Sequence, residues 1–374
     1  MRTVQLAVSP PNAITLNPVP AASVAQWREG LRGRIETVLE GFVGDRCDEY
    51  VRGVPSAGFV RELLTSYLAG GKYIRSAFTC LGWLCGAGET PAALRAAASI
   101  ELVHAFALMQ DDVMDRSAVR RGQPAAHVRL AGWHREQNRV GDAGRFGESA
   151  AILLGDLCLV WADRMLRESG LDAAALARGW PVYDTLRGEL AVGQFADLWY
   201  DTRHLPTMEA VLDMSRRKSG NYTVRRPLEL GAALAGCDQP VRDALSRYGT
   251  LIGEAFQLRD DLLDIFGPSS ATGKPTGGDL REHKATSVVT LAAELAGPAS
   301  RAEFGWLCAQ EALDESMVAR LRELIEETGA ADRIEQMIGS RVQAALASLC
   351  GIRIGDFPLT ALRDLAAQAT GRVR

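Results

Sequence analysis

The sequence predicts an all-α protein. Apolar residues recur at helical spacing from Ala22 onward, for example in 149–169, 181–200 and 241–266. Runs that alternate apolar and polar residues between turn residues, which are typical of strands, are nearly absent. The chain has 374 residues, of which 47% are hydrophobic and 24% charged, so it is long and apolar enough to bury a large core. We therefore expect one large helical domain.

This domain is predicted to cover 23–374. Residues 1–22 are predicted to form a flexible tail, because they contain four prolines among small and polar residues and lack the basic start and long apolar core of a signal peptide. Two segments interrupt the helical pattern. The first, 127–147, is rich in Arg and Gly, and the second, 267–284, has the sequence GPSSATGKPTGGDLREHK. We predict that both are irregular, and that the second is a functional loop because it follows an aspartate cluster.

Charge and cysteine content exclude several classes of protein. The net charge of −4 provides no general attraction to nucleic acid or to an anionic membrane. The seven cysteines are odd in number and scattered without CxxC spacing, which argues against a disulfide framework or a zinc site and favours a reducing cytoplasm. The long uncharged stretch 76–88 is too short to span a bilayer, so we predict no transmembrane helix.

A first acidic motif lies near the end of a predicted helix, in the stretch ALMQDDVMDRSAVRRG (107–122). On a helical wheel, Asp111 and Asp115 lie within about 40° of each other, and His104 lies on the same side. The opposite side carries Leu102, Phe106, Met109 and Val113. One face of this helix therefore carries carboxylates, and the other packs into the core.

The segment GEAFQLRDDLLD (253–264) repeats this design. One face carries Gly253, Phe256, Gln257, Asp260 and Asp264, and the opposite face carries Leu251, Leu258, Leu262 and Ile265. Asp112 and Asp261 lie beside the two acidic faces, at about 100° from the first aspartate of each motif. A single DDxxD motif is more often a solvated polar face, but two occurrences in the same register favour a function.

Two facing acidic helices predict a cation site. If the helices face each other, six carboxylates share one cavity mouth. A pair of like charges about 4 Å apart repels by roughly 4 kcal/mol at an effective dielectric constant of about 20, so cations must lie between them. All-oxygen ligands favour Mg²⁺ or Ca²⁺, and Mg²⁺ binds through a few carboxylates together with waters and substrate phosphates. This predicts a phosphorylated substrate.

Basic residues flank both acidic motifs. The stretch GGKYIR (70–75) places Lys72 and Arg75 three residues apart, on one side of the helix expected to follow it. The other basic residues near the motifs are Arg120, Arg121, Lys218, Lys274 and Lys284. Each alone is expected to be merely solvated, but as a set they predict two anionic groups, one bridged through metal and one held directly. The pattern favours a site for two diphosphate substrates.

Five motifs occur in a fixed order and cover almost the whole chain after the tail. They are GGKYIR, DDVMD followed by RRG, GQFAD, FQLRDDLLD and GKPTGGDLREHK. In these motifs the sequence resembles the trans-isoprenyl diphosphate synthases, or polyprenyl synthetases. The resemblance implies the all-α isoprenoid synthase fold, with two aspartate-rich helices facing each other across a deep apolar central cavity. It also implies a homodimer that acts as a Mg²⁺-dependent prenyltransferase.

The resemblance assigns roles by position. The Mg²⁺ ligands implied are Asp111, Asp112, Asp115, Asp260, Asp261 and Asp264. The residues implied to hold isopentenyl diphosphate are Lys72, Arg75, His104 and Arg121. Those implied to meet the allylic diphosphate are Arg120, Lys218, Gln257, Lys274 and Ser219, the last where the family usually has Thr. Lys284 is also predicted to bind substrate. The implied catalytic residues are Asp111, Asp112, Asp115, Lys218, Asp260, Asp261 and Lys274.

The implied reaction depends on electrostatic stabilisation. Metal ions and cationic side chains stabilise the departing diphosphate, and the isopentenyl double bond attacks the allylic cation. A proton then leaves, with the released diphosphate as the base. Water must be excluded because it would quench the cation, and we expect closure of the 267–284 segment to exclude it.

Product length is predicted from the floor of the cavity beneath the first motif. The family places this floor five and four positions before the first aspartate, here at Phe106 and Ala107. An aromatic residue only at the fifth position, without an insertion in DDVMD, resembles the C20 pattern, so geranylgeranyl diphosphate is the expected product and farnesyl diphosphate the alternative. The helical wheel disagrees, because it puts Phe106 on the packing side and Ala107 toward the metals.

Three other classes remain open. A terpene cyclase of the same fold would also ionise an allylic diphosphate, but it would not need the GGKYIR cluster. A non-catalytic partner subunit is argued against by the intact aspartates, and a helical scaffold with exposed acidic faces predicts no Mg²⁺-dependent binding of diphosphates. We expect the two diphosphate substrates and a second copy of the chain as partners, with no nucleic acid and no stable membrane insertion.

Overall fold

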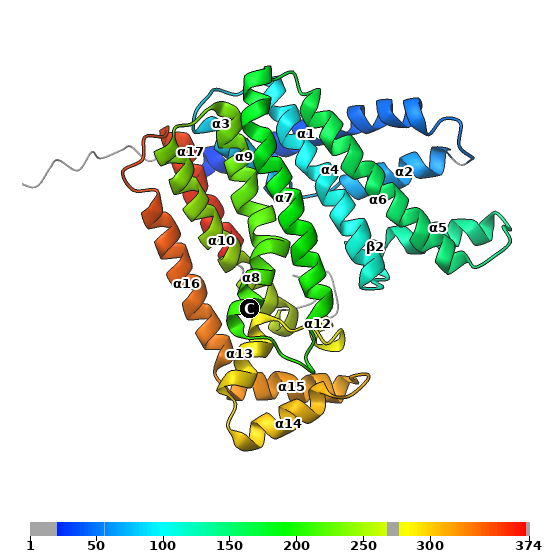
Figure 1. Cartoon of the computed structure of the whole chain (residues 1–374), viewed down its shortest axis with the longest axis vertical. Helices are drawn as coiled ribbons and strands as arrows, with labels where there is room; N and C mark the ends of the chain where they lie inside the picture. Colours follow the sequence, from blue (N-terminus) through cyan, green and yellow to red (C-terminus); the bar gives the residue numbers. More distant parts are fainter. Residues whose placement is uncertain (1–20, 56, 268–276, 372–374) are drawn as a thin grey trace, which may run out of the picture.

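The computed structural model describes residues 21–55, 57–267 and 277–371, which form an array of α-helices with one short hairpin (Figure 1). The helices before residue 200 are α1 (Ala21–Tyr50), α2 (Ala57–Leu68), α3 (Ile74–Leu84), α4 (Pro91–Met114), α5 (Ala126–Glu136), α6 (Ala143–Arg167) and α7 (Ala173–Trp199). They are followed by α8 (Met208–Ser215), the π-helix η1 (Arg216–Arg225), α9 (Arg226–Ala235), α10 (Gln239–Phe266), α12 (Gly278–Arg281), α13 (Ser287–Leu295), α14 (Pro298–Cys308), α15 (Glu315–Glu327), α16 (Ala330–Ser348) and α17 (Asp356–Thr370). The predicted all-α fold class is confirmed.

The only strands in the described part of the chain, β1 (Val119–Arg120) and β2 (Gln123–Pro124), pair antiparallel between α4 and α5. The long helices α4, α6, α7, α9 and α10 occupy the middle of the molecule, with η1 packed against both α7 and α10. Helix α5 and the start of α6 project to the right in Figure 1, and α14 and α15 lie at the bottom. Apolar side chains form three buried clusters among these helices.

Capping residues fix where the two aspartate-bearing helices begin. The Thr90 side chain accepts a hydrogen bond from Ala93 N at the start of α4, and Asp238 does the same for Val241 N at the start of α10. Both helices also carry a proline in the first turn. The DDxxD motifs lie at the opposite, C-terminal ends of α4 and α10. The helix dipole disfavours negative charge at a C-terminus, so cations stabilise these aspartates against the dipole as well as against one another.

The expectation that 127–147 is irregular is wrong. Most of it belongs to α5 and α6, and only 137–142 connects the two helices. Asn138 and Gly141 make the turn with positive φ angles of 50° and 101°, and the side chain of Asp142 caps α6. The Arg and Gly residues that suggested a loop lie mostly on the outer sides of these two helices. The second interruption, 267–284, contains the short helix α12. Its residues 268–276, which include Lys274, lie outside the described residues.

The predicted tail, 1–22, lies outside the described residues apart from its last two positions, which belong to α1. One helix, α4, is long and apolar enough to cross a membrane by length and composition, but 61% of its most apolar window is buried in the fold. The sequence prediction overlooked it because Arg95 and Glu101 interrupt its uncharged runs. All seven cysteines are free thiols, in line with the expected absence of disulfides.

Candidate active site

Asp112, the second aspartate of the first motif, is buried and hydrogen-bonded on both carboxylate oxygens. Tyr67 of α2 donates its hydroxyl hydrogen to Oδ2 at 2.5 Å, and Nε of Arg120 donates to Oδ1 at 2.8 Å. Nη2 of Arg120 also donates to Oδ2 of Asp111 at 3.3 Å. The hairpin after α4 therefore folds back so that Arg120 neutralises two neighbouring aspartates.

Asp111 receives further donors from α7 and η1. Nζ of Lys218 lies 3.5 Å from its Oδ1, and Nε2 of Gln194 donates to the same oxygen at 3.2 Å. Burial favours the neutral carboxyl, but Lys218, Arg120 and then Lys284 outweigh it, so the pKa of Asp111 lies below its ordinary value. Asp111 is therefore ionised at neutral pH.

Lys218 also pairs with Asp197 of α7 at 2.5 Å. Burial acts to lower the pKa of Lys218, but Asp197 and Asp111 together raise it above the ordinary value. The lysine is a fully charged cation between two carboxylates.

Asp115, the third aspartate of the first motif, is paired with Lys284 at a distance of 2.6 Å. Lys284 also lies 3.0 Å from Glu282. Burial and then the charge of Asp111 raise the pKa of Asp115, although Lys284 opposes this shift. The pKa of Lys284 is raised, because Asp115 and other nearby carboxylates outweigh its burial. Each aspartate of the first motif is thus matched with a cation from another segment.

Close backbone packing positions Lys218. Gly193 of α7 lies so near η1 that a Cβ atom there would come within 2.2 Å of the Lys218 backbone nitrogen. On the other side of η1, a Cβ atom at Gly253 of α10 would lie 2.5 Å from the carbonyl oxygen of Gly220. These glycines seat η1 between α7 and α10, and π-helical turns of this kind are frequent at functional sites.

In the second motif, Asp261 accepts hydrogen bonds from neutral donors. Oδ2 of Asp261 accepts from the backbone nitrogen of Ser287 at 3.0 Å and from its hydroxyl at 2.5 Å, and Oδ1 accepts from Gln257 at 2.9 Å. Burial raises the pKa of Asp261, and the bonds from Ser287 and Gln257 only partly offset this. Asp261 therefore holds the first turn of α13 against α10.

Asp264 organises the chain that follows α10. Its Oδ2 accepts from the backbone nitrogen of Asp279 at 2.9 Å, and its carbonyl oxygen accepts from Gly277 N at 2.6 Å. Asp260 is half-buried on the same helix. The second motif thus anchors both α12 and α13, which bring Lys284 to the site.

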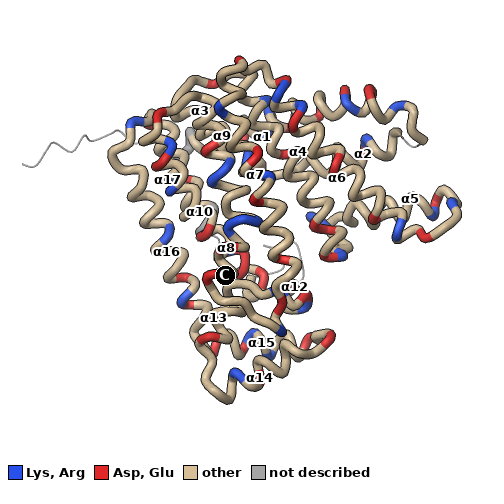
Figure 2. The backbone as a smooth tube through the Cα atoms, in the orientation of Figure 1, with Lys and Arg blue, Asp and Glu red and all other residues tan. Residues whose placement is uncertain are grey.

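A small cavity of about 90 Å³ joins the surroundings of the two motifs. Its lining includes Lys218, Ser219, Gln257, Asp261 and Lys284. Lys218 and Lys284 pair with the first motif. The cavity is therefore lined both by cations of the first motif and by Asp261 of the second. Figure 2 shows acidic and basic residues interleaved around α12 and the lower end of α4.

Within the described ranges 21–55, 57–267 and 277–371, no group of three or more Asp, Glu, His or Cys side chains lies close enough to hold a metal ion. The expectation that six carboxylates share one cavity mouth stays a prediction. At the first motif, Arg120, Lys218 and Lys284 supply the charge that compensates the aspartates.

Two of the residues expected to bind isopentenyl diphosphate meet at Tyr222 of η1. The Arg75 guanidinium lies 4.2 Å from the centre of the Tyr222 ring and donates to the Thr223 hydroxyl at 3.0 Å. Nδ1 of His104 lies 2.9 Å from the Tyr222 hydroxyl. Burial, followed by the charges of Arg75, Arg121 and Arg120, lowers the pKa of His104 well below its ordinary value. A neutral histidine therefore lies among three guanidinium groups.

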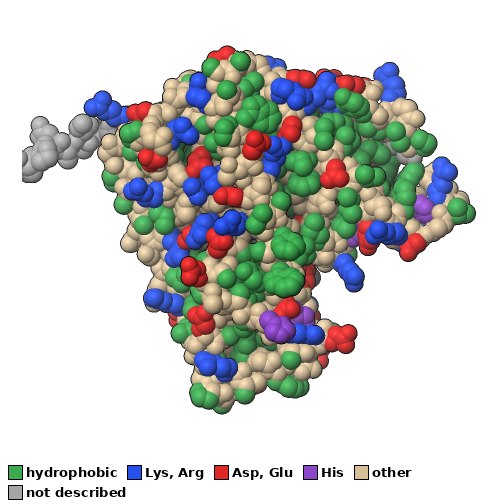
Figure 3. Space-filling model, in the orientation of Figure 1, with side chains coloured by type: hydrophobic (Ala, Val, Ile, Leu, Met, Phe, Trp, Pro, Cys, Tyr) green, Lys and Arg blue, Asp and Glu red, His purple; other side chains and the backbone are tan. Residues whose placement is uncertain are grey.

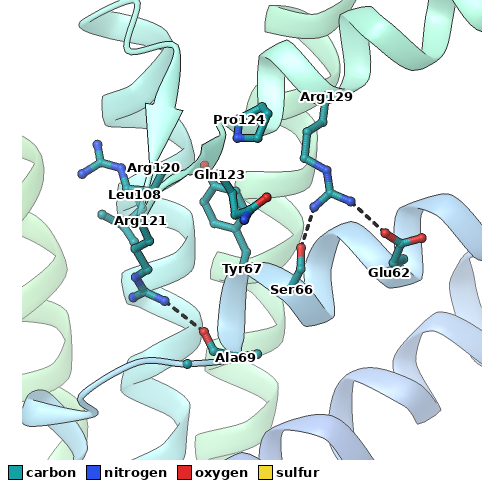
Figure 4. Close-up of a pocket in the computed structure, with 11 residues that line it drawn as sticks. Glu62, Ser66, Tyr67, Ala69, Leu108, Arg120, Arg121, Gln123, Pro124 and Arg129 are labelled. Atoms are coloured by element: carbon teal, nitrogen blue, oxygen red, sulfur yellow. Dashed lines mark hydrogen bonds and ion pairs between the residues drawn. The ribbon is translucent and has the colours of Figure 1, made fainter. Parts of the chain in front are cut away.

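Arg121 borders a larger cavity of about 560 Å³ between α2, α4 and the hairpin (Figure 4). Its Nη1 donates to the Ala69 carbonyl oxygen at 3.1 Å. Lys72 is exposed in the turn before α3, so the expectation that it shares a helix with Arg75 is wrong. The reason is Tyr73, whose left-handed φ of 45° places the start of α3 after Lys72.

Phe106 and Ala107 are both half-buried and pack into the cluster formed by α4, α6 and their neighbours. Gly155 of α6 lies against this part of α4, since a Cβ atom there would be 3.6 Å from the Phe106 carbonyl oxygen.

Sequence reasoning missed several polar residues at the site, namely Tyr67, Gln194, Asp197, Tyr222 and Asp279. Gln194 and Asp197 were visible in the GQFAD motif, where a spacing of three residues puts both on one side of a helix. Asp279 lies in the quoted segment GGDLREHK, and burial followed by Asp264 raises its pKa well above the ordinary value. The two tyrosines belong to no acidic or basic pattern, so only the fold reveals them.

The fold and this site define a class of all-α proteins with two DDxxD helix ends, in which the lysines paired with the first motif line a cavity with Asp261 of the second. A model of the polyprenyl synthetase family matches residues 58–325, and the chain belongs to this family. The family predicted from the five motifs is therefore confirmed.

Individual relatives agree with this assignment. The chain is 35% identical over 226 residues to a geranylgeranyl diphosphate synthase of Methanosarcina mazei. The match covers 60% of this chain and 64% of the relative, which is less than two thirds of the relative's length. It is 33% identical over 300 residues to a (2E,6E)-farnesyl diphosphate synthase of Mycobacterium bovis, covering 79% of this chain and 78% of the relative.

A solved structure resembles the whole fold. It is the geranylgeranyl pyrophosphate synthase from Corynebacterium glutamicum, complexed with isoprenyl diphosphate and magnesium. It matches with a TM-score of 0.86 and 36% sequence identity, over 94% of this chain and 99% of the other. The predicted isoprenoid synthase fold is confirmed, and the names of all three relatives agree with the predicted class of enzyme, a prenyltransferase.

Proposed function

We propose that the chain is a trans-prenyltransferase that condenses isopentenyl diphosphate with an allylic diphosphate to form a short-chain all-trans prenyl diphosphate. The observation that carries the proposal is the alternation of carboxylates and cations at the end of α4. Asp111 contacts both Arg120 and Lys218, and Asp115 contacts Lys284. Such a site has the groups needed to hold a metal-bound diphosphate: carboxylates for the metal and cations for the phosphate oxygens.

The donor set fits Mg²⁺. Asp111, Asp115, Asp260 and Asp264 offer carboxylate oxygens, the ligand type that hard divalent cations prefer. Both oxygens of Asp112 accept bonds from Tyr67 and Arg120, so we assign Asp112 to orienting Arg120 rather than to the metal. When bound, Mg²⁺ supplies positive charge that stabilises the diphosphate leaving group.

The residues of the chain complete the reaction. Arg120, Lys218 and Lys284 bind the allylic diphosphate and stabilise the charge it gains as the allylic C–O bond breaks. Lys274 and Gln257 are proposed to assist, as in the family. The isopentenyl double bond then attacks the allylic carbon to form the new C–C bond, and the proton lost from isopentenyl leaves with the released diphosphate.

A separate group of cations supports a second diphosphate. The charges of Arg75 and Arg121 both lower the pKa of His104, and Arg121 borders the cavity of about 560 Å³. We assign these residues, with Lys72, to isopentenyl diphosphate. Arg120 lines the same cavity and also contacts Asp111, so the two diphosphates lie on either side of one guanidinium group.

We propose geranylgeranyl diphosphate as the main product, with farnesyl diphosphate as the alternative. Phe106 is proposed to set the length from beneath the first motif, together with the small side chain of Ala107. The names of the relatives include both products.

We also propose that the enzyme is a homodimer of the reducing cytoplasm. Large apolar side chains are exposed along α6 and α7, namely Leu153, Val160, Val192, Phe195, Leu198 and Trp199. Hydrophobic side chains gather on this face in Figure 3. An extended apolar face is typical of a protein interface, and a second copy can cover it. Light scattering of the purified chain should give twice the monomer mass, whereas a monomer would contradict the dimer.

One experiment tests the function. The purified chain is incubated with isopentenyl diphosphate and dimethylallyl, geranyl or farnesyl diphosphate, and the dephosphorylated products are sized by chromatography. Longer linear prenyl alcohols, with a C20 end product, are the expected result. Hydrocarbons or alcohols formed from primer alone would indicate a terpene cyclase instead. Absence of any turnover would favour a non-catalytic subunit.

A further inference from the structure

We propose that Tyr67 is a positioning residue for the allylic diphosphate, acting through Asp112 and Arg120. It belongs to none of the motifs that carry the family resemblance. The proposal rests on the proposed function, because it concerns the affinity of the same site. It also gives a role to α5, in the part of the chain for which the sequence indicated none.

The Tyr67 hydroxyl makes one bond as donor and one as acceptor. It donates to Oδ2 of Asp112 at 2.5 Å and accepts from the backbone nitrogen of Ala126 at 3.2 Å. Asp112 has no exposed surface, so no solvent water replaces the tyrosine as its donor. With Tyr67 on one oxygen and Arg120 on the other, the carboxylate has one allowed orientation, and so has Arg120.

The acceptor bond attaches the first turn of α5 to this network. The N-cap residue of α5 is Ala125, which has no side-chain acceptor, so the Tyr67 hydroxyl serves a helix nitrogen that otherwise lacks a cap. Ala125 also donates its backbone hydrogen to the Ala118 carbonyl oxygen at 2.9 Å, which closes the hairpin that carries Arg120. Tyr67 therefore lies where α2, α4, the hairpin and α5 meet.

Helix α5 is itself fixed to α2. The rings of Trp133 and Phe59 stack with their centres 5.5 Å apart. Arg129 donates to the Ser66 hydroxyl at 2.7 Å and to Glu62 at 2.9 Å, as Figure 4 shows. These contacts hold Ala126 against Tyr67. Helix α5 thus supports the diphosphate-binding arginine through Tyr67, and its Arg129 lines the cavity of about 560 Å³.

The Tyr67→Phe variant removes the hydroxyl and keeps the ring. Asp112 then has an unpaired buried oxygen and holds Arg120 less firmly. The KM for the allylic diphosphate should rise by about tenfold, the usual effect of losing one hydrogen bond to a charged group. The KM for isopentenyl diphosphate should rise less than the KM for the allylic diphosphate. Tyr67 lines the cavity of about 560 Å³, but its hydroxyl bonds to Asp112 and Ala126 and to no residue assigned to isopentenyl diphosphate.

Binding gives a readout that does not depend on turnover. In the presence of Mg²⁺, inorganic diphosphate should bind the Tyr67→Phe variant about tenfold more weakly than the wild type in calorimetry. Tyr248→Phe is the matched control, because the buried Tyr248 hydroxyl also makes one short bond, 2.6 Å to the Leu362 carbonyl oxygen, away from the site. The control should lower the melting temperature by a similar amount and leave diphosphate affinity unchanged.

A double variant separates positioning from general destabilisation. If Tyr67 acts through Asp112, adding Tyr67→Phe to Asp112→Asn should weaken diphosphate binding no further. Independent, multiplying losses would overturn the proposal, and so would wild-type affinity in the Tyr67→Phe protein. If the wild type fails to condense the two diphosphates, the proposed function is wrong. The ratio of diphosphate affinities between wild type and variant still decides the role of Tyr67.

Discussion

The two DDxxD motifs share a spacing and a position at a helix C-terminus, yet they have different surroundings. In the first motif, Asp111, Asp112 and Asp115 are each bonded to a lysine or an arginine. In the second, Asp261 accepts hydrogen bonds from Ser287 and Gln257, which are neutral. The aspartates of the first motif are thus paired with cations, whereas Asp261 and Asp264 of the second also hold α13 and α12 in place.

The residues one and two turns earlier on each helix extend this difference. Seven positions before the first aspartate, α4 has His104, while α10 has Gly253, which allows η1 to approach. Five positions before it, α4 has Phe106 and α10 has the small, buried Ala255. The same sequence pattern thus follows large side chains on α4 and small, closely packed residues on α10. Variants in the two motifs can separate the charge pairing of the first from the neutral hydrogen bonds of Asp261 in the second.

The largest effect is expected at Asp111. Asp111→Asn keeps the shape of the side chain but removes the charge that Arg120 and Lys218 share. We expect kcat to fall by about 10²–10³-fold, the usual result of removing one group that stabilises the transition state. Steady-state kinetics with an allylic primer measure this. The exposed Asp356 provides the control, since Asp356→Asn should retain wild-type kcat, and an Asp111→Asn enzyme with more than about a tenth of wild-type kcat would remove the distinction between the motifs.

The next effect is on stability and concerns the second motif. Asp261→Ala leaves the Ser287 backbone nitrogen and hydroxyl without their acceptor in a buried place. The free energy of unfolding should fall by about 2–4 kcal/mol, as for buried polar groups left unpaired. Asp111→Ala should cost under about 1 kcal/mol, because Lys218 keeps Asp197 and Arg120 keeps Asp112. Urea denaturation compares the two variants, and equal losses would show that the motifs have the same structural role.

The third effect is a pH dependence confined to α4. The pKa of His104 in the folded protein lies well below its ordinary value of 6.5. Below pH 6.5 the unfolded chain therefore binds a proton that the folded chain does not bind, so stability falls as pH falls. The slope is at most about 1.4 kcal/mol per pH unit for one group. In His104→Gln this contribution should disappear between pH 6.5 and 5.5, and an unchanged slope would argue that His104 is protonated in the fold.

The smallest effect is expected at Phe106, where a substitution should change the length of the product. Phe106→Ala opens space beneath the first motif, and the main product should become longer by at least one isoprene unit. Phe357→Ala removes the same volume far away, where Phe357 packs on Trp27, and should leave product length unchanged. Chromatography of the dephosphorylated products measures both. If Phe106→Ala gives the wild-type distribution, Phe106 is not the floor of the cavity.

Local patterns predict much of this fold. Helical spacing predicts the α-helices, and the wheel predicts that Leu102 and Met109 of α4, and Leu258 and Leu262 of α10, are buried, as they are. The wheel is reliable there because each side chain direction follows from position in the helix alone. The helical parts of 127–147, in α5 and α6, were missed because helices rich in Arg and Gly resemble loops in sequence.

Contacts between distant segments are less predictable. The partners of Asp115 and Asp112, namely Lys284 and Tyr67, lie 169 and 45 residues away in the chain. No spacing rule connects such pairs, because the packing of several helices brings them together. A motif predicts which residue types a site contains, while the fold decides which cation lies on which carboxylate. This is why the sequence predicts Arg120, Lys218 and Lys284 at the site but not which aspartate each of them contacts.

The central claim is that the carboxylates at the ends of α4 and α10 bind diphosphate together with Mg²⁺. The most direct test is condensation of isopentenyl diphosphate with farnesyl diphosphate, measured in Mg²⁺, in EDTA and after Mg²⁺ is restored. The account predicts a longer prenyl diphosphate in Mg²⁺, loss of product in EDTA and full recovery on restoration. Full condensation in EDTA would contradict it.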